Sequence, residues 1–143
     1  MQEIFMLVGR IMQTAQFVEW NIALTARLYF LLTSNRGGSY AQVENEAKKM
    51  QEDMQRMTMG EIIEVLRSVR GTSERELSML KRALHDRNYI AHTYFKERDF
   101  ASFGYSQIVR ERNYLNEVLA NMTALNDGLC SLIKRQKISL GVR

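Results

Sequence analysis

The sequence contains no proline and only one cysteine in 143 residues. Helical proteins tolerate the lack of proline easily, because proline breaks helix interiors, whereas β proteins often use it in turns. The lone Cys130 excludes an intrachain disulfide and a zinc site built from cysteines. Low cysteine content is also typical of a reducing compartment. We therefore expect a helical, cytoplasmic protein.

Long uncharged apolar runs are also absent. Glu19 and Arg27 interrupt the most apolar region, so no stretch reaches the roughly 18 residues expected of a membrane span. Glu3 and Arg10 flank and interrupt the first apolar run, which a signal peptide would not show. The sequence therefore predicts no membrane helix and no secretion signal.

No strong excess of one charge is present. The 20 Lys and Arg against 16 Asp and Glu give a net charge of +4. This modest basic excess is compatible with a nucleic-acid partner without establishing one. The length suits a single domain with its own core, which we place at residues 1–138, with 139–143 as a frayed tail.

Apolar residues recur at steps of three or four through most of the chain, which is the spacing of amphipathic helices. A long helix is expected over residues 4–32. Residues 35–38, Asn-Arg-Gly-Gly, should end it, because their glycines can adopt the left-handed cap conformation. Three capping boxes predict the starts of three further helices, the second of which should end near residues 70–71. These boxes pair Ser39 with Gln42, Thr58 with Glu61, and Ser73 with Glu76.

The C-terminal third of the chain predicts a loop over residues 96–106 and a last helix over 106–137. The turn-like residues 126–128, Asn-Asp-Gly, suggest a weak or kinked point in that helix. The methionine stripe Met50, Met54 and Met57 indicates core or dimer contacts. Together these patterns predict an all-α, antiparallel bundle of four to five helices.

The helix that begins after Ser73 has an apolar seam at Leu77, Leu80, Leu84 and Ala91. Arg87 occupies the position missing from this seam, where the helix should face the core or a partner. A charged side chain there is costly unless something pairs with it. If the helix continued, Tyr94 would lie on the same seam, with His92 beside it.

The full pattern Arg-x4-His-x-Tyr around these residues has a chance probability under about 1% in a sequence of this composition. The segment 87–94, Arg-Asn-Tyr-Ile-Ala-His-Thr-Tyr, resembles the signature of HEPN domains (higher eukaryotes and prokaryotes nucleotide-binding). It is similar to the subgroup of toxins, and of substrate-binding subunits, that pair with minimal nucleotidyltransferases. We call residues 87–94 the motif segment.

This resemblance implies a metal-independent endoribonuclease without a cofactor, acting on RNA as a homodimer whose two motif segments share one cleft. His92 would carry a proton, and Arg87 would grip the phosphate. Asn88 would orient these groups, and Tyr94 would be the residue that a nucleotidyltransferase antitoxin modifies. Glu19, within an apolar helix, is a further candidate for the cleft.

Other interpretations remain open. The same fold could serve as a non-catalytic, nucleotide-binding partner subunit of a nucleotidyltransferase, or as a plain interaction bundle. His85 lies seven residues before His92, about 10.5 Å along a helix, which is too far for both to hold one metal ion. We expect His85 at the surface and Asp86 on a solvated helix face.

Overall fold

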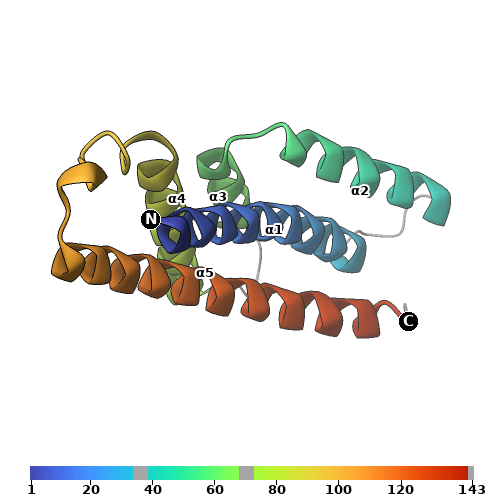
Figure 1. Ribbon diagram of the computed structural model, residues 1–143. Helices are drawn as coiled ribbons and strands as arrows, with labels where there is room; N and C mark the ends of the chain where they lie inside the picture. The colour runs from blue at the N-terminus through green and yellow to red at the C-terminus, as the bar shows by residue number, and fades with distance from the viewer. Residues whose placement is uncertain (34–38, 68–72, 142–143) are drawn as a thin grey trace.

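The computed structural model describes residues 1–33, 39–67 and 73–141 (Figure 1). All regular structure in these ranges is helical, which confirms the all-α prediction. The glycines at residues 37–38 and the predicted helix end at residues 70–71 lie outside the described ranges. The elements are α1 (Gln2–Thr33), α2 (Tyr40–Gln55), α3 (Met59–Arg67), α4 (Glu74–His92), the 3-10 helix η1 (Phe100–Ser102) and α5 (Tyr105–Ser139).

Helix α1 is the centre of the packing, because it contacts α2, α3, α4 and α5. Figure 1 shows α1 and α5 side by side, with α2 along the other side of α1 and α4 crossing behind the long pair. Within the described ranges, no helix is both long enough and apolar enough to cross a membrane.

The α1–α5 pair corrects the expectation of a purely antiparallel bundle. Glu3 contacts Arg112 near the start of both helices, and Gln136 donates to the carbonyl oxygen of Thr25 near their ends. The two helices therefore run in the same direction. This is possible because the intervening chain, with α2, α3 and α4, returns across the bundle before α5 begins.

The predicted helix starts are confirmed by reciprocal hydrogen bonds. At the start of α4, the backbone N–H of Glu76 donates to Ser73 Oγ at 3.1 Å, and the N–H of Ser73 donates to the Glu76 carboxylate at 3.2 Å. The same pair of bonds closes the boxes before α2 and α3. These local contacts fix where each helix begins.

The hydrophobic core follows the predicted stripes. Met54 is buried in it, and Met50 and Met57 pack against it, so the methionine stripe belongs to the core. The core residues of the two long helices include Ile4, Leu7, Ile11, Ala15, Val18 and Ile22 of α1 and Leu115, Val118, Leu119, Met122, Leu125 and Leu129 of α5.

Two predictions about the C-terminal third were wrong in part. Helix α5 continues unbroken through residues 126–128, where Asn126 accepts a hydrogen bond of 2.7 Å from Asn21 of α1. Packing along α1 supports the helix on both sides of Gly128 and overrides its weak helix propensity. The predicted loop 96–106 contains η1, and α5 begins at Tyr105 and ends at Ser139.

Candidate functional site

The motif segment forms the last two turns of α4 and the turn that follows. The helix ends at His92, and the backbone N–H groups of Thr93 and Tyr94 both donate to the carbonyl oxygen of Tyr89. This tight turn closes the helix without glycine or proline. It places His92 at the exposed C-terminal end of α4, where a cationic side chain is favourable.

Arg87 points toward α1 and pairs with Glu19. Its Nη2 lies 3.3 Å from Glu19 Oε1, and its Nη1 donates to Asn88 Oδ1 at 3.2 Å. The side chains of Arg87 and Glu19 are 34% and 32% exposed, respectively. The guanidinium is therefore held between two acceptors while part of it stays open to an anionic ligand. The structure thus brings together three of the predicted site residues, Arg87, Asn88 and Glu19.

His92 is not part of this cluster within one chain. A separation of five residues turns the helix by about 140° and advances it about 7.5 Å, so the two side chains leave different faces of α4. His92 is exposed. A site that contains both an arginine and a histidine therefore needs a ligand that spans the two faces, or a second copy of the chain.

Exposed apolar side chains surround the end of α4. The Phe5 ring of α1 stacks on Phe95 at 5.4 Å between centroids, although 57% of Phe5 and 38% of Phe95 are exposed. Ala91 is also exposed, which corrects its predicted place on the apolar seam. The buried line of α4 runs from Leu80 through Ala83 to Ile90, in steps of three and seven, so Ile90 and not Ala91 continues it.

Tyr94 does not fit the predicted role of a modification site. Its side chain is fully buried, and its hydroxyl donates to Glu111 Oε2 at 2.8 Å. Burial, with a further contribution from the hydrogen bond to Glu111, raises the pKa of the Tyr94 hydroxyl above its usual range. A modifying enzyme could reach this hydroxyl only after the surrounding segment opened.

Arg98 completes the network around Tyr94. No motif marked this residue, and the aromatic residues nearby were its one visible signal in the sequence. Its Nε donates to Glu111 Oε2 at 2.9 Å, and its Nη1 donates to Tyr89 Oη and to the Tyr94 carbonyl. The guanidinium carbon lies 4.0 Å from the centre of the Tyr94 ring, a cation–π contact. This network anchors the turn after His92 onto α5.

Asp86 is buried, which corrects the prediction of a solvated position. It packs between α4 and α5, and its only ion-pair neighbour in the described ranges is Arg82, at 4.0 Å. Burial raises the pKa of the Asp86 carboxyl, although the charges of Arg82 and His85 oppose this shift. His85 is exposed on α4, as expected.

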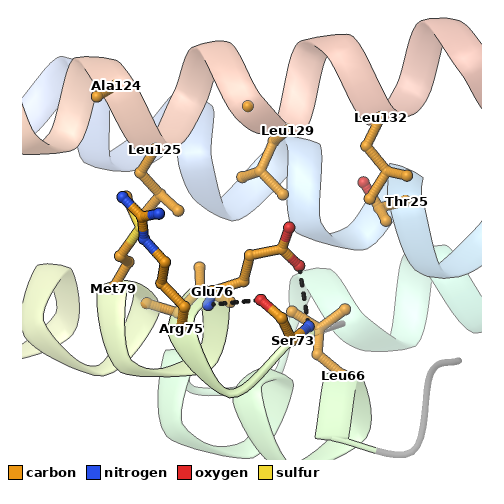
Figure 2. A pocket seen from close by; sticks show the side chains of 12 residues that line it. Thr25, Leu66, Ser73, Arg75, Glu76, Met79, Ala124, Leu125, Leu129 and Leu132 are labelled. Carbon is orange, nitrogen blue, oxygen red and sulfur yellow. Dashed lines mark hydrogen bonds between the residues drawn. The ribbon is translucent and has the colours of Figure 1, made fainter. Parts of the chain in front are cut away.

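Several hollows adjoin α1 or α4. A cavity of about 380 Å³ is lined mainly by α1, α3, α4 and α5 and has mostly apolar walls, with the Ser73–Glu76 capping box and Arg75 at its rim (Figure 2). A second hollow of about 210 Å³, between α4 and α5, is lined in part by Asp86. A smaller hollow of about 130 Å³ includes Glu19 and thus adjoins the Arg87 pair. Within the described ranges, no group of three His, Cys, Asp or Glu side chains is arranged to hold a metal ion.

Comparisons of the chain with protein-family models, with curated proteins and with solved structures gave no match.

Proposed function

We propose that this chain is a metal-independent endoribonuclease of the HEPN type that works as a homodimer. The observation that supports the proposal is the partly exposed Arg87 side chain, held by Glu19 and Asn88, near the end of α4 that presents His92. An arginine of one copy and a histidine of a second copy, brought together in a dimer, would supply a phosphate clamp and a proton carrier, which RNA cleavage without a metal requires. The eight-residue motif segment supplies the family resemblance.

In the proposed reaction, the 2′-hydroxyl oxygen of a ribose attacks the adjacent phosphorus and the bond to the 5′ oxygen breaks. His92 of one copy accepts the proton of the 2′-hydroxyl, and His92 of a second copy gives a proton to the departing 5′ oxygen. Arg87 binds the phosphate oxygens and stabilises their additional charge in the transition state. The products are a 2′,3′-cyclic phosphate and a 5′-hydroxyl.

We propose a homodimer because Arg87 and His92 of one chain leave different faces of α4, so that one composite site needs groups from two copies. A second copy docked against the exposed Phe5–Phe95 stack, which lies just beyond the end of α4, would place its His92 near the first copy's motif segment. We further propose that the protein is cytoplasmic and acts as a toxin or defence effector. A nucleotidyltransferase is the proposed antitoxin partner.

One observation favours the alternative of a non-catalytic partner subunit. Within one chain, the arginine cluster lacks the histidine, so a monomer could hold a nucleotide phosphate without cleaving RNA. The test is incubation of purified protein with single-stranded RNA in excess chelator, followed by analysis of the product ends. Cyclic phosphate ends support the nuclease, whereas nucleotide binding without cleavage supports the partner subunit.

A further inference from the structure

The hollow beside Glu19 has the features of a binding site. It lies where α1 meets the end of α2 and the start of α3, and its volume is about 130 Å³. Met54 and Ile62 are buried and form its inner wall, while Trp20, on its rim, is 55% exposed. The full lining is Gln16, Glu19, Trp20, Met54, Gln55, Met57 and Ile62.

The rim of this hollow carries polar groups without protein partners. In the part of the chain that the structure describes, the side-chain amides of Gln16 and Gln55 and the indole N–H of Trp20 form no hydrogen bond. Glu19 uses Oε1 for Arg87, which leaves Oε2 as an acceptor. An aromatic face, apolar walls and convergent donors and acceptors are the features that bind a flat polar ring.

We propose that this hollow binds the base of a cytosine in single-stranded RNA, stacked on Trp20 and recognised by Glu19. The inference rests on the proposed function, in that RNA is taken as the substrate, and it adds base selectivity to that function. Stacking on an exposed aromatic ring is the general way in which proteins hold unpaired bases.

The hollow is open on one side, and its volume of about 130 Å³ is close to that of an enclosed cavity, about 150 Å³, that accommodates benzene, so a single ring would fill it. The carboxylate of Glu19 distinguishes the two pyrimidines of RNA, because an ionised carboxylate only accepts hydrogen bonds. Cytosine offers it the N4 amino group, whereas uracil would present the O4 oxygen and be repelled.

Glu19 also connects this hollow to the phosphate anchor. One oxygen of its carboxylate pairs with Arg87, so the guanidinium lies directly beside the base-binding hollow. Because N4 and the ribose-bearing N1 lie on opposite sides of the cytosine ring, a base whose N4 faces Glu19 directs its own ribose and phosphate away from Arg87. A phosphate of another nucleotide in the same strand would then lie at Arg87, so the preferred substrate is single-stranded RNA with a cytosine near the cleaved phosphate.

Trp20 allows a direct test, because it is the only tryptophan in the chain. Its fluorescence should be quenched when a base stacks on it. Short oligocytidylate should quench the emission with an affinity about tenfold higher than that of oligouridylate. In Glu19→Gln, whose amide can both donate and accept, the two affinities should become equal within about twofold.

Two further variants complete the experiment. Trp20→Leu should weaken binding of labelled oligocytidylate about tenfold, since stacking on an aromatic side chain contributes much of the affinity for an unpaired base. Phe17→Ala is the matched control: Phe17 lies on the same helix with 52% exposure, outside the hollow, and its replacement should leave binding unchanged. Trp20 is exposed enough that its replacement should not unfold the protein.

The outcomes separate this proposal from the nuclease itself. Selective quenching by oligocytidylate that persists in His92→Ala supports the cytosine site, whether or not the wild type cleaves RNA. Cleavage without quenching, or equal quenching by both oligonucleotides, overturns the site and leaves the nuclease standing. Emission that changes with protein concentration and not with RNA assigns the hollow to contact between copies and also overturns it.

Discussion

Arg87 of α4 and Glu19 of α1 form an ion pair at 3.3 Å, although they lie far apart in the sequence. The pair sits at the junction of the two helices, with about a third of each side chain exposed. At this exposure, an ion pair contributes at most about 1 kcal/mol to stability. Because Arg87 contributes so little to stability and lies at the edge of an apolar seam, we infer that its role is to bind an anion.

Replacement of Arg87 tests this interpretation. Arg87→Ala should reduce RNA cleavage by at least about a hundredfold, while the free energy of unfolding falls by less than about 1 kcal/mol. Arg87→Lys should recover little activity, because lysine lacks the planar fork that grips two phosphate oxygens. Cleavage rates and denaturant unfolding should be measured on the same samples. A large loss of stability with unchanged cleavage would make Arg87 a structural residue.

Ala91 tests the proposed dimer. Ala91 is exposed one turn beyond Arg87 in the last turn of α4, so Ala91→Glu would bring a charge onto the end of the helix that the second copy is proposed to cover. The variant should be monomeric by light scattering and should not cleave RNA, since each site then lacks the second copy's groups. Ala120→Glu, at an exposed position of α5, is the matched control and should remain dimeric. A fully active Ala91→Glu dimer would contradict the proposed interface.

Tyr94 should contribute to stability and not to chemistry. Tyr94→Phe removes the hydroxyl that donates to Glu111 and should lower the free energy of unfolding by about 1–2 kcal/mol, measured by chemical denaturation. Cleavage by the folded variant should equal that of the wild type. Tyr114→Phe serves as the comparison, because Tyr114 lies beside Tyr94 and its hydroxyl forms no hydrogen bond with the residues that the structure describes. Loss of cleavage by folded Tyr94→Phe would restore a functional role for this hydroxyl.

Asp86 should make the protein less stable as pH rises. Burial raises its pKa above 3.8, so the folded state binds the proton more tightly than the unfolded chain does. The free energy of unfolding therefore decreases as pH rises from 3.8 through the folded-state pKa, and stays reduced above it. Asp86→Asn, neutral at every pH, should melt at a higher temperature than the wild type at neutral pH.

Below pH 3.8 the advantage of Asp86→Asn should disappear, because the wild-type carboxyl is then protonated in both states. Asp127→Asn, at an exposed position of α5, is the control variant. Melting temperatures measured across this pH range decide the question. An Asp86→Asn variant that is less stable at neutral pH would show that the charged carboxylate is stabilising.

Local signals in the sequence predicted the helices well. The reciprocal bonds of Ser73 and Glu76 involve residues three apart, so the sequence contains everything needed to predict them. The apolar stripes of α1 and α5 could also be predicted from the sequence, because helical periodicity is a local property. The prediction of a weak point at residues 126–128 was wrong because their helical state depends on packing against α1, which is not a local property of the sequence.

The candidate site could be predicted only in part. The motif segment marked Arg87 and His92, and the cost of a charge on an apolar seam indicated that Arg87 needs a partner. The burial of Tyr94 and its bond to Glu111 depend on how the chain turns after His92, which no short spacing encodes. Asp86 was misplaced because α4 contacts three helices, α1, α3 and α5, and a single apolar stripe does not reveal every contact.

Cleavage by His92→Ala tests the central proposal most directly. The variant should retain the wild-type fold by circular dichroism, because His92 is exposed, and should lose RNA cleavage because the proton carrier is gone. His85→Ala, an exposed histidine two turns earlier on the same helix, is the matched control and should cleave nearly as well as the wild type. Both should be assayed in excess chelator beside the wild type. Loss of cleavage in His92→Ala alone is the predicted result, and undiminished cleavage by well-folded His92→Ala would contradict the nuclease assignment.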